Sequence, residues 1–394
     1  MNRHIRFESW IGARLGAGEH EGTSVVEGAL VLEFPRGARE YDDPHGGRPP
    51  AKYEVACWTS PAIAPGFCFS ELVSSWNART PPGTWIEVSL RVTTTAGPTT
   101  PWYVMGRWAE TDQDIAPTSV PGQRDERVRV DVDRLGLVEE GAGASYQLRV
   151  SLLRREGCSA TPAVTLLGCV ASDVRAGEHE ASSMRNGAAG IVLDVPTYSQ
   201  QLHLGEYPQW AGGGESWCSP TSTSMVLEHW GLGPSSHDYA WVEPTVPDRF
   251  VPYAARHTFD HAYDAPGNWS FNAAYAARFG ATAFVTRLRS LAEAELFVRA
   301  GIPLVVGVAF TPDQLDGAGY TTTGHLAVVV GFDEDGNVVC NDPASHGTPS
   351  NDAVRATFDR AQFERAWMRS AGGITYVIRP PGLPLPQPPA EANW

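Results

Sequence analysis

The sequence predicts two domains: an all-β sandwich at residues 1–175 and an α+β domain at residues 191–379. Three observations predict this division. Apolar and polar residues alternate in short runs from about residue 24 to 172, segment 176–190 holds almost no large apolar side chain, and helical stretches then mix with apolar β runs. A chain of 394 residues is also longer than one hydrophobic core usually spans.

The alternation in the first domain is typical of half-buried strands. In WIEVSLRV, apolar residues Ile86, Val88 and Leu90 point one way while the polar residues between them point the other. RVRVDVD and SYQLRVSL repeat the pattern, and Gly- and Pro-rich segments such as TAGPTTP supply turns. Segment 176–190 then reads as a linker, because it collects Gly, Ser and charged residues.

Composition and charge exclude two classes of partner. The chain has 30 Lys and Arg against 45 Asp and Glu, so its formal net charge of -15 would repel nucleic acid. No run approaches the roughly 20 apolar residues of a membrane-spanning helix, so we expect no membrane segment.

Four of the six cysteines fall in two pairs, Cys57 with Cys68 and Cys158 with Cys169, each eleven residues apart. Zinc ligands usually lie two to four residues apart, so this spacing does not indicate a zinc site. The N-terminus lacks the apolar core of a secretory signal, which predicts a cytoplasmic protein with reduced thiols. If the start is truncated or mis-assigned, the protein would be secreted, and the two pairs could form disulfides.

The segment WCSPTSTSMVLEHWG, residues 217–231, predicts a helix that begins at Cys218. Pro220 suits its first turn and Gly231 ends it. The unpaired N–H groups and the positive dipole end of a helix start favour a thiolate and lower a thiol pKa. Cys218 is therefore the candidate nucleophile.

A thiolate needs a base, and His325 opens an apolar run in TTGHLAVVVGFDEDGNVVCNDPAS. This segment predicts a β-hairpin with an Asp-Gly turn at 335–336, which carries His325 and Asp342. On an ideal ladder the two lie on one face but about 13 Å apart along the strand, so contact needs a bulge, strong twist or a slipped turn. Asn341 is the alternative partner for the imidazole.

Other histidines and the sixth cysteine compete less well for a catalytic role. His229 lies eleven residues past Cys218 on the helix, about 16 Å away. His257 and His261 have the one-turn spacing of a zinc pair, but threonine stands where a zinc protease needs glutamate, so we expect no metal. Cys340 shares a strand face with Asp342 and is expected to be a buried thiol.

Acyl transfer through a thiolate also needs a donor for the oxyanion. A side-chain amide upstream of the cysteine can act with the N–H of Cys218. Gln200, Gln201 and Gln209 all lie upstream, and position alone does not separate them.

Five blocks in this order, VPTYSQ, WCSPTSTSMVLEHWG, AGIPLVVGV, GHLAVVVGF and NDPAS, resemble the papain-like peptidases typified by bacteriocin-processing, double-glycine-leader enzymes and their stand-alone relatives. The resemblance implies a papain-like fold for residues 191–379. It also implies Gln200 in the oxyanion hole, Cys218 as nucleophile, His325 as base and Asp342 as the residue that orients it. Many members have glycine after the cysteine, where this chain has Ser219.

These observations predict a cysteine peptidase that hydrolyses peptide or protein substrates without metal or cofactor. Papain-like folds also host amidases and transferases, so those activities are alternatives. A different alternative is a carbohydrate- or cell-wall-binding protein with an auxiliary second domain. In that case tryptophans of the sandwich would form a stacking face, and Trp85 would be the one to test, because it alternates away from the apolar face of its strand. The candidates are Trp58, Trp76, Trp85, Trp102 and Trp108.

The proline-rich tail at 380–394 cannot form a helix or an interior strand. We expect it to lie extended over the surface or to be disordered, and we assign it no function.

Overall fold

The computed structural model describes residues 3–138, 141–174 and 184–394. The chain forms two compact units. One comprises Arg6–Arg175 with Phe259–Asp264, and the other comprises Met1–Ile5, Ala176–Thr258 and Ala265–Trp394. The first part of the predicted linker lies outside the described residues, up to residue 183. Its described part belongs to the second unit, because the N–H groups of Asn186 and Ala188 donate to the Glu295 carboxylate at 2.5 and 3.0 Å.

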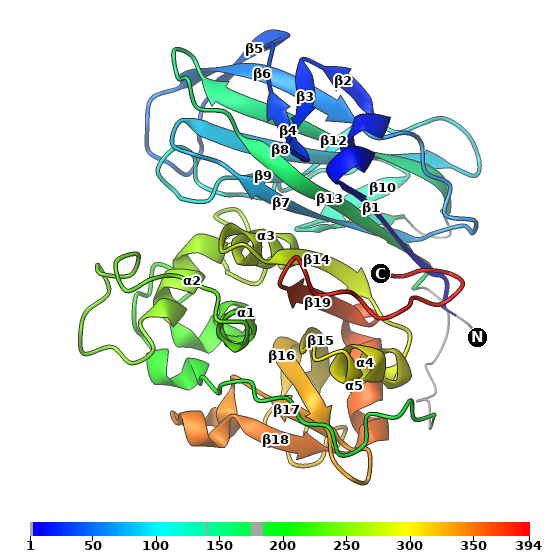
Figure 1. Ribbon diagram of the computed structural model, residues 1–394, viewed down its shortest axis with the longest axis vertical. Helices are drawn as coiled ribbons and strands as arrows, with labels where there is room; N and C mark the ends of the chain where they lie inside the picture. Colours follow the sequence, from blue (N-terminus) through cyan, green and yellow to red (C-terminus); the bar gives the residue numbers. More distant parts are fainter. Residues whose placement is uncertain (1–2, 139–140, 175–183) are drawn as a thin grey trace. The chain divides into compact units, whose positions relative to one another are not determined.

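The N-terminal unit consists of two antiparallel sheets and one short 3-10 helix, Gly12–Ala17 (Figure 1). One sheet has the order β10 (Val128–Asp131), β11 (Arg134–Leu137), β7 (Glu71–Arg79), β13 (Ala163–Ser172), β4 (Ala29–Leu32) and β3 (Thr23–Val26), and β1 (Ile5–Ile11) also pairs with β13. The other has the order β2 (Glu19–Glu21), β6 (Ala51–Thr59), β12 (Gly143–Arg155), β8 (Thr84–Thr94) and β9 (Tyr103–Trp108), and β5 (Gly37–Tyr41) also pairs with β6. The alternating runs therefore do form strands.

The strand β8 is buried on both faces, so the prediction of a half-exposed strand was wrong. Trp85 is fully buried. Its ring lies 4.8 Å from that of Tyr41 and 5.6 Å from that of Tyr53, on strands β5 and β6. On the same polar side, Glu87 forms ion pairs with Arg39 and Arg107, both at 2.8 Å. Local alternation cannot reveal this second layer, because residues far apart in the sequence supply it.

The tryptophans expected to form a stacking face do not form one. Three of the others are also buried in the core: Trp58, Trp76 and Trp108. Trp102 is partly exposed, but the guanidinium groups of Arg149 and Arg91 lie 4.2 and 4.5 Å from its ring. These five side chains serve packing and cation–π contacts instead.

All six cysteines are free thiols. Cys68 is exposed, whereas Cys169 is buried on β13, where burial raises the pKa of its thiol. The two disulfides that remained open from the sequence are therefore absent in this structure.

In its described residues the C-terminal unit contains an antiparallel sheet and five α-helices (Figure 1). The strand order is β14 (Thr282–Arg287), β19 (Ile374–Arg379), β15 (Leu304–Phe310), β16 (Thr322–Phe332), β17 (Val338–Asn341) and β18 (Arg355–Phe358). The helices are α1 (Cys218–His229), α2 (Phe250–Thr258), α3 (Trp269–Arg278), α4 (Leu291–Arg299) and α5 (Arg360–Ala371), with short 3-10 turns at Gln200–His203, Gly214–Ser216, Ser345–Gly347 and Asn351–Ala353. Among the described helices none has the length and apolar character needed to span a bilayer.

The β16–β17 hairpin differs from the predicted one in its turn. The predicted two-residue turn at 335–336 is a longer loop, because the N–H of Asp333 donates to the carbonyl of Asn337 at 3.0 Å and the three residues 334–336 lie between this pair. Gly336 adopts a positive φ of 79° inside this loop, and its N–H donates to the Asp333 carbonyl at 2.9 Å. The Asp333 carboxylate also accepts from the N–H of Asn337 at 2.8 Å, which stabilises the longer loop.

The register of the hairpin brings Asp342 toward His325. The longer loop shifts the ladder by one residue, and a β-bulge at 329–331 shifts it by another. Asn341 pairs with Val328, so the next residue, Asp342, lies beyond Val328 in the direction of His325 and not opposite residue 329. The separation of His325 and Asp342 along the strand is therefore about 7 Å, whereas the ideal ladder gave about 13 Å. Of the three alternatives that the sequence left open, the structure has two, a slipped turn and a bulge.

The tail at 380–394 has no helix or strand, as predicted, but its last residues are not simply extended over the surface. The side-chain amide of Asn393 is buried and donates to Arg287 O at 2.8 Å and to the Glu293 carboxylate at 2.9 Å. The Trp394 ring packs 5.0 Å from that of Phe297. The tail therefore contributes to the core of this unit.

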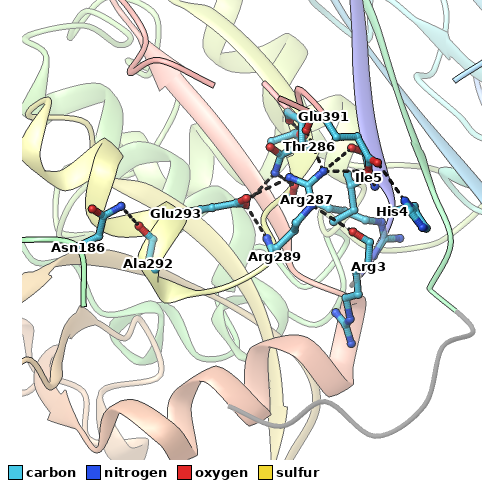
Figure 2. A network of polar contacts seen from close by, with 11 residues as sticks. Arg3, His4, Ile5, Asn186, Thr286, Arg287, Arg289, Ala292, Glu293 and Glu391 are labelled. Carbon is cyan, nitrogen blue, oxygen red and sulfur yellow. Dashed lines mark hydrogen bonds and ion pairs between the residues drawn. The ribbon is translucent and has the colours of Figure 1, made fainter. Parts of the chain in front are cut away.

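A polar network holds the tail against the start of the chain. Figure 2 shows Arg289 between two carboxylates, with distances of 3.0 Å to both Glu293 and Glu391. Glu391 also accepts from the N–H of Ile5 at 2.7 Å. Because Arg289 and Glu391 are only partly exposed, this network adds ion pairing to the packing of Trp394.

Candidate active site

Cys218 is the first residue of α1, as the sequence predicted. Trp217 caps the helix with a non-helical backbone, and Pro220 occupies the first turn, where its missing N–H costs no hydrogen bond. The helix packs against β16, and Ser222 Oγ donates to Leu326 O at 3.0 Å. Cys218 is partly exposed, unlike the buried residues that follow it in the first turn.

The local environment favours the thiolate of Cys218. Burial of the sulfur would raise its pKa, but the hydrogen bond and the charge of His325 lower it below its usual value. The N–H groups of Leu326 and Ser219 act in the same direction, and that of Ser219 belongs to the first turn of α1.

His325 lies on β16 and connects the thiol to a buried carboxylate. Its Nε2 lies 2.7 Å from Asp342 Oδ1, and both side chains are nearly inaccessible, at 5% and 2% exposed. With Nε2 engaged by Asp342, Nδ1 is the ring nitrogen left for Cys218. Burial would lower the pKa of His325, but the Asp342 charge and hydrogen bond, together with Cys218, raise it. His325 therefore favours its protonated form beside a thiolate.

Tyr320 completes the surroundings of Asp342, and the sequence reading missed it. Its hydroxyl donates to Asp342 Oδ2 at 2.8 Å, and its ring meets the His325 ring edge-on at 5.8 Å. Burial would raise the pKa of Asp342, but the His325 charge, its hydrogen bond and that of Tyr320 lower it. Tyr320 lies in the irregular loop before β16, where no periodicity marks a functional side chain. A hydroxyl five residues before the candidate base was the only signal.

Of the three glutamines, Gln200 is the one whose side chain is hydrogen-bonded to the segment just before Cys218. It is nearly buried, and its Nε2 donates to the carbonyl of Glu215, three residues before Cys218, at 2.8 Å. The Gln200 N–H also donates to Pro343 O at 2.9 Å, next to Asp342. Gln201 continues the 3-10 turn, and Gln209 is exposed.

Two residues near the hairpin have other partners. Asn341, the alternative partner of the imidazole, donates to Pro196 O at 3.0 Å and accepts from Arg355 at 2.9 Å. Cys340 is fully buried on β17, and burial followed by the charge of Asp342 raises the pKa of its thiol. Neither competes with Asp342 or Cys218.

The three other histidines considered from the sequence lie elsewhere. His229 contacts Asp194 O at 2.9 Å, at the far end of α1 from Cys218. The His257 ring lies 4.2 Å from that of Tyr253 and is tilted against it, and His261 contacts Pro117 O at 3.0 Å within the other unit. Among the residues that the structure describes, no three His, Cys, Asp or Glu side chains gather in a way that could hold a metal.

Comparison with protein families found two matches. Residues 6–172 match the model described as the peptidase C39 N-terminal domain, and residues 192–374 match that of the peptidase C39-like family. No curated protein matches the chain. The second match contains all four predicted site residues: Gln200, Cys218, His325 and Asp342.

Proposed function

The chain is a relative of the C39 papain-like cysteine peptidases, and from this premise we propose that its C-terminal domain hydrolyses peptide bonds with Cys218 as nucleophile and His325 as base. Asp342 would orient the imidazole, and Gln200 would bind the oxyanion. The observation that carries the proposal is the contact series from Cys218 through His325 to Asp342 at a helix start, which lowers the thiol pKa.

In the first half of the reaction, the Cys218 thiolate, whose proton His325 has taken, attacks the substrate carbonyl carbon. The carbonyl oxygen becomes an oxyanion, which accepts from the Cys218 N–H and from Gln200 Nε2. One Nε2 hydrogen is used by Glu215 O, so the second supplies this bond. The protonated His325 then gives its proton to the leaving amine as the C–N bond breaks, leaving a thioester on Cys218.

In the second half, His325 takes a proton from water, and the resulting hydroxide attacks the thioester carbon. The C–S bond breaks, the carboxylic acid leaves and Cys218 departs as a thiolate beside the protonated His325, which restores the starting ion pair. Asp342 keeps the ring oriented throughout and stabilises the imidazolium, without itself accepting the proton.

The experiment is digestion of a peptide library by the full chain, read by mass spectrometry. We expect cleavage by the wild type and by Cys340→Ala, a matched thiol deletion in the same unit, and none by Cys218→Ala. Cleavage by Cys218→Ala would contradict the proposal. The product masses also separate hydrolysis from acyl transfer to an amine, and labelling of Cys218 by an epoxide separates a peptidase from a binding protein, which needs no activated thiol.

A further inference from the structure

A groove of about 590 Å³ lies beside the candidate active site, within the C-terminal unit. It is lined by the start of β16, by the end of β15 and by one face of α5, including Thr321–Thr323, Phe310, Arg365 and Arg369. The sequence reading assigned no role to these residues, and the mechanism above uses none of them.

Contacts connect this groove to His325. Phe310 lines the groove, and its ring lies 5.1 Å from that of Tyr320. The Tyr320 ring in turn lies 5.8 Å from that of His325. Thr323 also precedes His325 by two residues on the same strand, about 7 Å along it.

The groove lies on the leaving-group side of the reaction. His325 protonates the leaving amine, so the C-terminal part of the substrate departs next to this ring. The oxyanion donors, Gln200 and the N–H of Cys218, come from other segments, the 3-10 turn and α1. An extended peptide advances by about 3.3–3.6 Å per residue, so the groove lies about two to four residues beyond the scissile bond.

Two guanidinium groups give the groove its chemistry. Arg365 and Arg369 lie one turn apart on α5, so they project from the same face. Among the described residues neither has an ion pair or a hydrogen bond, although like charges at this spacing repel each other. The helix dipole favours Arg369 in the last turn, but it does not account for Arg365 one turn earlier.

The other groups of the groove leave a net positive site. Among the described residues that line it, Asp313 is the one acidic side chain, and its carboxylate accepts from the Thr311 hydroxyl at 2.5 Å. Gln362 is bound to Asp316 at 2.8 Å. The hydroxyls of Thr321–Thr323 add neutral donors. Because the chain as a whole carries a net charge of -15, this pair of arginines is a local exception.

We propose that this groove binds a carboxylate-bearing side chain of the substrate, two to four residues beyond the scissile bond. The inference rests on the proposed peptidase function and assigns it a preference for acidic peptides. Two guanidinium groups match a carboxylate because their N–H donors pair with both of its oxygens.

The test uses two peptides that share a cleaved sequence from the library and differ by Glu or Gln at the second to fourth leaving-side positions. Glu and Gln have the same shape, so only the charge changes. We expect the wild type to cleave the Glu peptide about five- to thirtyfold more efficiently in kcat/KM, and we expect this ratio to shrink with added salt. It should fall toward one in Arg365→Gln and Arg369→Gln. It should persist in Arg299→Gln, which removes the same charge from an exposed position on α4.

A ratio of one in the wild type, or an unchanged ratio in both groove variants, would overturn the inference while leaving the peptidase proposal intact.

A second experiment measures binding and does not need catalysis. Fluorescence anisotropy of labelled Gly-Glu-Glu-Glu and Gly-Gln-Gln-Gln peptides on the full-length Cys218→Ala variant should show tighter binding of the Glu peptide, lost in the double variant with Arg365→Gln and Arg369→Gln. Absence of cleavage of any peptide would reject the peptidase function, and equal binding of the two labelled peptides would reject the groove.

Discussion

Replacing Tyr320 by phenylalanine tests how the site positions its base. The change removes one hydroxyl, which donates to Asp342 Oδ2 at 2.8 Å, while the other carboxylate oxygen faces His325 Nε2 and the N–H of Ala344. Since Oδ2 has no other hydrogen bond among the residues that the structure describes, Tyr320→Phe leaves a buried, charged oxygen unpaired.

The size of the effect follows from this geometry. A hydrogen bond to a charged group contributes about 1.5–3 kcal/mol. In a unit of this size each kcal/mol corresponds to a shift of about 2–4 °C in Tm, so we expect Tm to fall by about 3–12 °C. The same loss lets Asp342 and the imidazole turn, and we expect kcat to fall about tenfold or more while KM changes little.

The pH dependence gives Tyr320→Phe a signature that a loss of packing would not have. The hydroxyl stabilises the ionised form of Asp342, whose pKa in the folded state is lowered. Such a carboxyl contributes stability above its unfolded pKa of about 3.9 and loses it as the pH falls through the folded value. The difference in stability between wild type and variant should therefore be full at neutral pH and shrink below about pH 4.

The assay is thermal unfolding from pH 7 down to pH 3, with steady-state kinetics at neutral pH. The matched control is Tyr275→Phe, which removes a buried hydroxyl that has no hydrogen-bond partner within the described part of the chain, and it should leave Tm unchanged or slightly higher. Equal Tm values for wild type and Tyr320→Phe, or a difference that is the same at pH 3 as at pH 7, would refute the reasoning.

Three further predictions concern the thiol, the oxyanion donor and the tail. The rate of iodoacetamide alkylation of Cys218 should reach half its maximum below the pH expected for a free cysteine. His325→Ala should move this midpoint to higher pH, because the partner charge is lost. Coincident pH profiles of wild type and variant would exclude His325 as the partner. Gln200→Ala should lower kcat about 10²- to 10³-fold with a near-normal KM, whereas Gln209→Ala, at an exposed position, should keep the wild-type rate. A loss of rate in Gln209→Ala with a normal rate in Gln200→Ala would exchange their roles. Trp394→Ala should lower the free energy of unfolding of the C-terminal unit by about 3 kcal/mol in urea titrations, and no change would show that the buried tail does not stabilise it.

Local patterns were enough to predict the elements and the principal candidates of the site. Cys218 begins a helix because Pro220 and the following residues suit one. His325 lies in a strand because an apolar run follows it. Each of these signals arises within about ten residues of sequence, so it is present before the chain folds.

Features that depend on contacts between distant segments were predicted wrongly or not at all. Trp85 is buried because β5 and β6 cover the side of β8 that alternation assigned to solvent. The tail is partly buried because Asn393 and Trp394 meet residues about one hundred positions earlier in the chain.

The sequence by itself determined which side chains could form the site, since helix starts, strand runs and turn residues depend on near neighbours. The tertiary structure decided which of them meet. Asp342 approaches His325 only because a longer loop and a β-bulge each shift the ladder by one residue, and Tyr320 reaches the carboxylate from a loop without a pattern. Register and loop position depend on the packing of the whole sheet, and no local pattern encodes that packing.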